Sequence, residues 1–183
     1  MKYFQLLLND RYDVMPCING WAQKYDTRFI NEKDCHKLPS RDLLFVEPNR
    51  DTVFPSVVNF PFFLVTETVF DAVKLYEPGI VSKEVVLLDG QYAKSEVYFM
   101  PILKSVDCLH PDTVWKSDRK TFNKIVLDRD KLGKEAIFRP AGASHTIAIA
   151  RFDLIESILR RGAKGIGLIP LETRSSSEEG AII

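Results

Sequence analysis

The chain has 183 residues, 45% of them hydrophobic, which is enough for one domain with a substantial core. Lysine and arginine number 25, as do aspartate and glutamate, so no overall field attracts nucleic acid or an acidic membrane surface. The sequence has no apolar stretch of about 18 residues that would predict a membrane span, and the apolar run 6–8 is too short for a signal peptide. Three widely spaced cysteines indicate reduced thiols. We therefore expect a cytoplasmic protein that binds neither nucleic acid nor membrane.

Two short strands are expected in the first quarter of the chain. Residues 2–8 and 41–47 are rich in apolar residues, and each run stops at turn-forming residues. The segment 10–40 between them carries scattered aromatic residues without a clean period, so its pattern predicts no particular element.

The first helix is predicted at residues 66–77. Apolar residues stand at i, i+1, i+4 and i+7 from Val69, a spacing that places them on one face of a helix. Thr66 is a candidate cap for its start. Pro78 and the glycine that follows it end the helix, because proline disfavours helical geometry in the residue before it.

The remaining strands are predicted as short β-type runs separated by glycine and proline. They are 85–89 and 96–103, which are expected to form a hairpin or part of a meander, then 125–129, 136–140 and 145–150, and finally 165–171. Because strands come in runs and do not alternate with helices, the pattern favours the α+β class with a mainly antiparallel sheet and a few helices. We expect a single domain at residues 1–172, followed by a flexible tail at 173–183.

A second helix is predicted at residues 152–161, within the most charged and glycine-punctuated stretch of the chain. Apolar residues at i, i+1, i+4 and i+5 from Leu154 form its buried face, and Glu156 lies four residues before Arg160, the favourable order for an ion pair. Gly162 stands where a left-handed cap is wanted. The glycines that follow stand between a helix and a strand, the reverse of the order in a dinucleotide-binding fingerprint.

Four residues are candidates for contact with a protein partner. Trp115 follows a turn signal, which favours partial exposure, and tryptophan concentrates contact energy at interfaces. Arg160, Arg161 and Lys164 form a cationic group that can meet an anion or a partner. The alternative is that these three residues only complete a solvated helix end.

The sequence predicts no catalytic residue, no metal site and no cofactor. Cys35 is adjacent to a histidine, and Cys108 lies two residues before His110, but neither pair has the spacing of a structural zinc site. Ser144 and His145 are neighbours in a predicted strand, so their side chains point to opposite faces.

Most of the chain resembles a family of small bacterial proteins that are assigned as immunity proteins of polymorphic toxin systems. The segments that carry the resemblance are 63–90, 95–113 and 137–171. Their shared features are a helix, a strand beginning near Val81, a strand ending in Pro101, then Cys108 with a short aspartate-containing turn, and a carboxy-terminal strand-helix-strand.

The resemblance implies a protein that protects its producer, or a neighbour, by binding a cognate toxin domain, and it carries no catalytic residue across. Immunity proteins against nucleases are often strongly acidic, whereas this chain is neutral. Either the toxin is not a basic nuclease, or the acidic surface is local. The alternatives are a small enzyme or ligand-binding domain whose pocket uses His110 or His145, and a structural partner in a surface or secretion assembly. The sequence does not indicate an oligomeric state.

Overall fold

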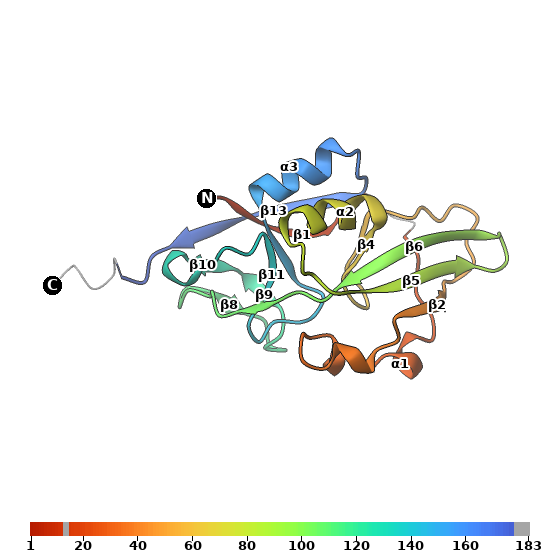
Figure 1. Ribbon diagram of the computed structural model, residues 1–183, viewed down its shortest axis with the longest axis horizontal. Coiled ribbons are helices and arrows are strands. Elements are labelled where there is room, and N and C mark those ends of the chain that lie inside the picture. Colours follow the sequence, from red (N-terminus) through yellow and green to blue (C-terminus); the bar gives the residue numbers. More distant parts are fainter. Residues whose placement is uncertain (13–14, 178–183) are drawn as a thin grey trace.

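The computed structural model describes residues 1–12 and 15–177. Within these residues the chain forms two larger β-sheets, a two-stranded ribbon and three α-helices (Figure 1). The α+β class is therefore confirmed. Most strand pairs are antiparallel, as expected, but β2 with β5, β7 with β11, and β10 with β13 run parallel.

The first sheet has the strand order β10-β13-β1-β12-β11-β7. Its strands are β1 (Tyr3–Leu8), β7 (Ser105–Val106), β10 (Val126–Asp128), β11 (Ile137–Pro140), β12 (Ala148–Arg151) and β13 (Ile166–Arg174). Strand β1 lies between β12 and β13 and is antiparallel to both, so that Leu6 pairs with Ala148 on one side and Leu168 on the other. The beginning and the end of the chain are thereby joined in one sheet.

The second sheet has the order β2-β5-β6-β4-β3. Its strands are β2 (Arg41–Phe45), β3 (Val57–Val58), β4 (Leu64–Thr66), β5 (Ser82–Asp89) and β6 (Lys94–Pro101). The β5–β6 hairpin is as predicted, and with β2 it projects to the right in Figure 1. We call β2, β5 and β6 the wing. A separate ribbon pairs β8 (Val114–Trp115) with β9 (Phe122–Lys124).

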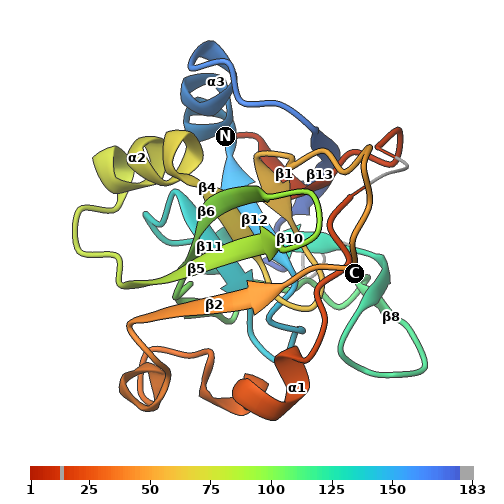
Figure 2. The same cartoon turned by 90° about the vertical axis from the view of Figure 1, so that its right-hand side faces the viewer.

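The helices lie on both sides of the strands (Figure 2). They are α1 (Trp21–Lys24), α2 (Glu67–Tyr76) and α3 (Phe152–Arg160), with short 3-10 turns η1 (Thr27–Phe29), η2 (Cys35–Lys37) and η3 (Arg129–Lys131). Helices α2 and α3 pack side by side, and Tyr76 Oη donates a hydrogen bond to the Asp153 carbonyl oxygen at 3.1 Å. Most of both predicted apolar stripes is buried beneath them, but Leu159, predicted on the buried face of the second helix, is 47% exposed because it lies in the last turn of α3. No helix in the described part of the chain is long and apolar enough to cross a membrane.

Residues 17–38, which the sequence pattern left unassigned, cover one face of the second sheet. They contribute Ile18, Tyr25, Ile30, Cys35 and Leu38 to a core that also holds Leu44, Leu87 and Tyr98 from the sheet. A clean period is missing because the segment consists of one short helix and two 3-10 turns joined by irregular backbone. Its aromatic and aliphatic residues reach the core from several directions.

The start of α2 differs from the prediction, whereas the end of α3 agrees with it. Thr66 occupies the N-cap position of α2, but its side chain makes no capping hydrogen bond, so that part of the prediction was wrong. At the end of α3, Gly162 has a φ of 78°, the left-handed geometry predicted for it. Gly165 is also left-handed, at 72°, where the chain turns into β13.

The predicted tail begins too early. Strand β13 continues to Arg174, where it pairs with β10, so residues 173 and 174 belong to the sheet. Beyond it, Ser176 Oγ donates to the carboxylate of Asp128 at 2.7 Å, and Ser175 Oγ donates to Asp130 at 2.6 Å. Asp128 is fully buried, and a buried carboxylate needs such donors, which also hold its pKa below the ordinary range. The rest of the predicted tail, 178–183, lies outside the described residues.

Candidate functional site

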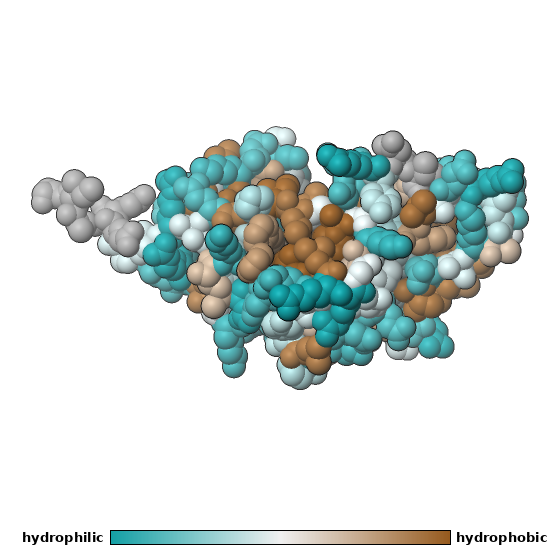
Figure 3. Space-filling view, turned by 90° about the horizontal axis from the view of Figure 1, so that it is seen from above, coloured by the Kyte–Doolittle hydropathy of each residue, from teal (hydrophilic) through white to brown (hydrophobic). Residues whose placement is uncertain are grey.

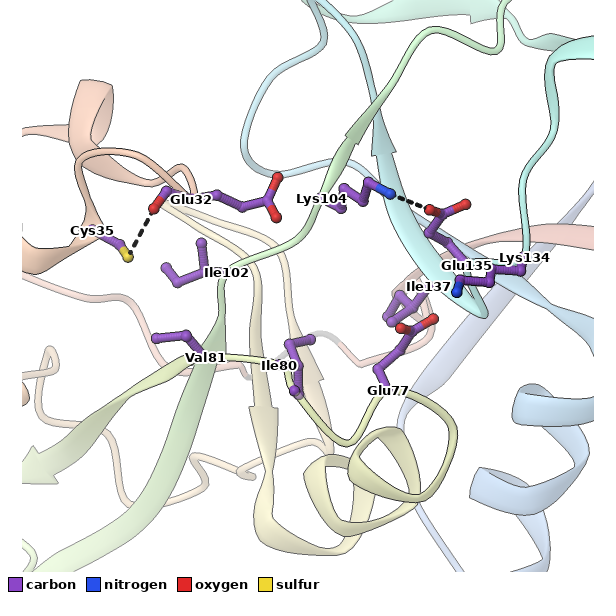
Figure 4. A pocket seen from close by; sticks show the side chains of 11 residues that line it. Glu32, Cys35, Glu77, Ile80, Val81, Ile102, Lys104, Lys134, Glu135 and Ile137 are labelled. Carbon is purple, nitrogen blue, oxygen red and sulfur yellow. Dashed lines mark hydrogen bonds and ion pairs between the residues drawn. The ribbon is translucent and has the colours of Figure 1, made fainter.

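A cleft of about 390 Å³ lies at the junction of the two sheets, where the chain leaves β6 and enters β7 (Figure 4). Its walls come from four segments that are distant in sequence: 32–35, 77–81, 102–104 and 134–137. They belong respectively to the η2 region, the end of α2, the link from β6 to β7, and the start of β11. Tertiary folding alone brings these segments together.

The floor of the cleft is aliphatic and fixed by the protein core. Ile102 is 4% exposed and belongs to the core of the second sheet, whereas Ile137 is 2% exposed and belongs to the core beneath α2 and α3. Ile80 and Val81 continue the apolar surface toward solvent. Two separate cores therefore hold the floor in place.

Charged side chains surround this floor. The ammonium of Lys104 and the carboxylate of Glu135 form an ion pair, which lowers the pKa of Glu135 and raises the pKa of Lys104. The negative charges of Glu32 and Glu77 raise the pKa of Lys104 further. The carboxylate of Glu77 also accepts a hydrogen bond from the backbone N–H of Ala136. Lys104 therefore lies among three carboxylates.

Glu32 is the carboxylate with the fewest contacts. Its side chain extends across the cleft toward Lys104 (Figure 4), yet within residues 1–12 and 15–177 it has no side-chain hydrogen bond or close ion pair. Its backbone is held in place, because Cys35 Sγ donates to the Glu32 carbonyl oxygen at 3.6 Å. Arg139 stands nearby and donates to the Ile30 carbonyl oxygen at 3.2 Å. Burial lowers the pKa of Arg139, and the charge of Glu32 partly offsets that shift.

The end of α2 adds to the negative character of the cleft. This ten-residue helix ends at Tyr76, directly before Glu77. A helix C-terminus carries a partial negative charge from its unsatisfied carbonyl groups. Three carboxylates and a helix C-terminus thus face two lysines, Lys104 and Lys134, one of which is already in a close ion pair.

A second feature is an apolar face on the wing. Leu43 on β2 pairs with Val86 on β5, and Val86 pairs with Val97 on β6, so the three side chains form one row across the strands. Phe45 continues this face and is 56% exposed, while Leu43 and Val97 are 36% and 38% exposed. Figure 3, viewed from the side of α2 and α3, shows apolar residues gathered at the middle of this surface, with a smaller group where the wing lies.

Helix α2 covers only one end of this wing face. There Phe70 stacks on Phe99 of β6, with ring centroids 4.8 Å apart and planes 10° apart. The opposite face of the same sheet is packed against residues 17–38. The uncovered part of the wing face therefore leaves large apolar side chains in contact with solvent.

The four residues proposed from the sequence lie outside both features. Trp115 is half-buried and packs on Phe122, with ring centroids 4.2 Å apart. Arg160, Arg161 and Lys164 are exposed at or just beyond the end of α3. These three residues lie near one another because they are close in sequence, whereas Trp115 lies on a different element, the β8–β9 ribbon.

Neither histidine named in the alternative interpretation lines the cleft. His110 is 2% exposed, and its Nδ1 accepts the backbone N–H of Asp112 at 3.2 Å. His145 Nε2 lies 2.9 Å from the Pro61 carbonyl oxygen, and burial lowers the pKa of His145. The described part of the chain contains no group of three or more histidine, cysteine, aspartate or glutamate residues that could hold a metal ion.

Sequence reasoning missed the charged residues of the cleft. Glu32 lies in a segment without a readable pattern, and Lys104 and Glu135 are too far apart in sequence to indicate that they pair. One signal in the sequence could have indicated the cleft. Glu77 is a carboxylate at the C-terminal end of a predicted helix, where the helix dipole favours a cation. Comparison with protein-family models and with curated proteins gives no match.

Proposed function

We propose that this protein binds a cognate toxin domain and neutralises it by covering its working surface, without chemistry of its own. The observation that carries the proposal is the uncovered apolar face of the wing. The resemblance of segments within 63–171 to immunity proteins supports a toxin domain as the partner. The protein would then act in the cytoplasm of the cell that it protects.

The wing face has the properties of a protein-binding surface. Its residues Leu43, Phe45, Val86 and Val97 lie on hydrogen-bonded strands, β2 paired parallel with β5 and β5 paired with β6 in the hairpin, so the backbone of the face is already ordered before a partner arrives. Contiguous exposed apolar residues are uncommon on monomeric proteins and mark interaction sites when they occur. A rigid face loses little conformational entropy on binding, which favours affinity.

The alternative function, a ligand-binding domain, has one observation in its favour. The cleft volume of about 390 Å³ falls within the range of small-molecule sites, which is about 300–1,000 Å³. Because His110 and His145 do not line the cleft, chemistry in it would fall to its glutamates, its lysines and the thiol of Cys35. The wing face has no role in this alternative, so we rank it second.

Co-expression tests the proposed function. The gene next to this one is expressed with and without this protein, and both growth and co-purification are measured. We expect the neighbouring product to arrest growth when expressed alone, and the two proteins to restore growth and purify as a complex. Equal growth in both cases without a complex would overturn the proposal and bring the ligand-binding alternative forward.

Two variants locate the surface. Phe45→Lys and Leu43→Lys place a charge on the exposed wing face, so the fold should persist while the complex weakens by at least about tenfold. Ile169→Lys is the matched control, because Ile169 is 48% exposed and belongs to β13 of the other sheet. If Ile169→Lys weakens the complex as much as Phe45→Lys, the wing face is not the interface.

A further inference from the structure

We infer that the cleft between the two sheets receives an arginine side chain of the partner protein, with its methylene groups on the isoleucine floor and its guanidinium among the glutamates. This inference rests on the proposed function, since it assumes a protein partner. It assigns a second contact in addition to the wing face.

The aliphatic floor suits the stem of a long cationic side chain. Ile80, Ile102 and Ile137 line the cleft with hydrocarbon, and the carboxylates stand around them. Arginine and lysine bury their methylene groups along apolar surfaces while their charged heads remain among polar groups. A short or purely apolar side chain would leave the charged rim without a partner.

The charges favour a cation over an anion. Glu135 is already paired with Lys104, and Glu77 already accepts the N–H of Ala136. Glu32 reaches across the cleft, and the described residues supply no group that binds its carboxylate closely. Lys104 and Lys134 also line the cleft, but Lys104 is paired with Glu135, so the three carboxylates and the negative end of α2 outweigh the two lysines and favour a cation.

Guanidinium geometry favours arginine over lysine. Glu32 and Glu77 approach from different segments of the chain, so their oxygens lie on different sides of the cleft (Figure 4). The five N–H donors of a planar guanidinium can bind two carboxylates at once, while an ammonium acts as a point charge. The site also gives a neutral chain the local acidic surface that binding to a basic partner requires.

Small probes test the cleft without the partner. N-acetyl-arginine amide and its neutral isostere N-acetyl-citrulline amide are titrated into the full chain, with detection by NMR of isoleucine methyl groups. We expect the arginine probe to shift the methyl signals of Ile80, Ile102 and Ile137 with millimolar affinity, and the citrulline probe to bind at least about threefold more weakly. Equal binding of the two probes, or shifts elsewhere only, would overturn the inference.

Variants assign the binding to the carboxylates. Glu32→Gln removes the charge of an exposed side chain and should weaken binding of the arginine probe at least about threefold. Asp51→Asn is the control, because Asp51 is an exposed carboxylate outside the cleft. If Asp51→Asn weakens binding as much as Glu32→Gln, the effect is one of overall charge and the cleft is not the site.

The complex with the toxin domain separates this inference from the proposed function. Glu32→Gln combined with Glu77→Gln should weaken the complex at least about tenfold, since glutamine keeps the acceptor for the Ala136 N–H and changes only charge. A complex that is weakened by Phe45→Lys but not by the two glutamine changes would overturn the cleft inference and leave the proposed function standing. If the wild-type chain forms no complex, the proposed function fails, and no binding of the arginine probe would overturn the cleft inference as well.

Discussion

The C-terminal end of α3 and the cleft both collect charged residues, but they satisfy them differently. At the end of α3, Arg160 pairs with Glu156 at 3.4 Å, and Arg161 donates to the Ser157 carbonyl oxygen at 2.9 Å. Both partners lie four residues earlier on the same helix. In the cleft, the ion pair of Lys104 and Glu135 joins two distant segments, and Glu32 faces it from a third.

The comparison distinguishes charged residues that complete a local structure from charged residues that remain available to bind a partner. Arg161 binds a carbonyl oxygen of α3 and Arg160 binds a carboxylate of α3, and both cations lie at the negative end of the dipole of that helix. The carboxylates of the cleft exceed the cations that the fold supplies to them. Charged residues are therefore better candidates for binding where folding assembles them from several segments over an apolar floor.

The largest effect is expected from Ile137→Ala in the cleft floor. Ile137 is 2% exposed and packs in the core beneath α2 and α3, so truncation should cost about 2–4 kcal/mol of unfolding free energy through lost burial and a cavity. Val81→Ala is the control, because Val81 lines the same cleft but is 51% exposed. Urea unfolding measures both. Equal losses of unfolding free energy would show that the floor of the cleft is not part of the core. The comparison between the cleft and the end of α3 would then no longer hold.

The next effect concerns the backbone at the end of α3. Gly162→Val should destabilise the fold by about 1 kcal/mol or more, because a β-branched residue resists the left-handed φ of 78°. A Cβ at this position would meet no atom within 4 Å, so the cost comes from the backbone alone. Gly79→Val is a matched control, since Gly79 is equally open and its φ is not positive. If both variants unfold at the same urea concentration, the helix end does not depend on the left-handed cap.

The sequence predicted those parts of the fold that local patterns encode. Both longer helices, the β5–β6 hairpin and the left-handed Gly162 follow from the spacing of apolar residues and the positions of glycine and proline. The structure of residues 17–38 could not be predicted, because no period governs a segment that reaches the core through short turns. The early boundary of the tail was also a failure of local reasoning, since Ser175 and Ser176 are ordered by carboxylates on a distant segment.

The candidate site was less predictable than the fold. Arg160 and Arg161 were candidates because two adjacent arginines form a cationic group. Their contacts within α3 show that this group completes the end of the helix. Glu32, Glu77 and Lys104 show no relation in the sequence. They come together only because the chain crosses from the second sheet to the first beside the end of α2, and a single sequence does not encode that crossing in any short pattern.

A smaller effect is expected from the ion pair of the cleft. Because the pKa of Glu135 is lowered, mainly by its hydrogen bond with Lys104, this pair stabilises the protein at neutral pH and is lost as the pH falls below about 4.5. Glu135→Gln should therefore lower the urea midpoint at pH 7 by less than half the Gly162→Val effect, since Lys104 is exposed to solvent. The deficit relative to wild type should shrink as the pH falls from neutral through the lowered pKa of Glu135. A deficit that persists unchanged throughout acid titration would mean that packing, not charge, is responsible.

The smallest effect is expected from Arg160→Ala. The side chains of Arg160 and Glu156 are 79% and 45% exposed, and such helix pairs contribute only a few tenths of a kcal/mol, to which the interaction with the helix dipole adds a similar amount. Both contributions are screened by salt, so the loss should shrink further in 1 M sodium chloride. Urea unfolding at low and high salt measures it, and Arg160→Lys, which keeps the charge, is the control. If the proposed complex with a toxin domain forms, the same change should leave it intact, because the partner of Arg160 lies within its own helix. A loss as large as that of Gly162→Val, or a weakened complex, would mean that this helix end is more than a solvated terminus, and the distinction from the cleft would fail.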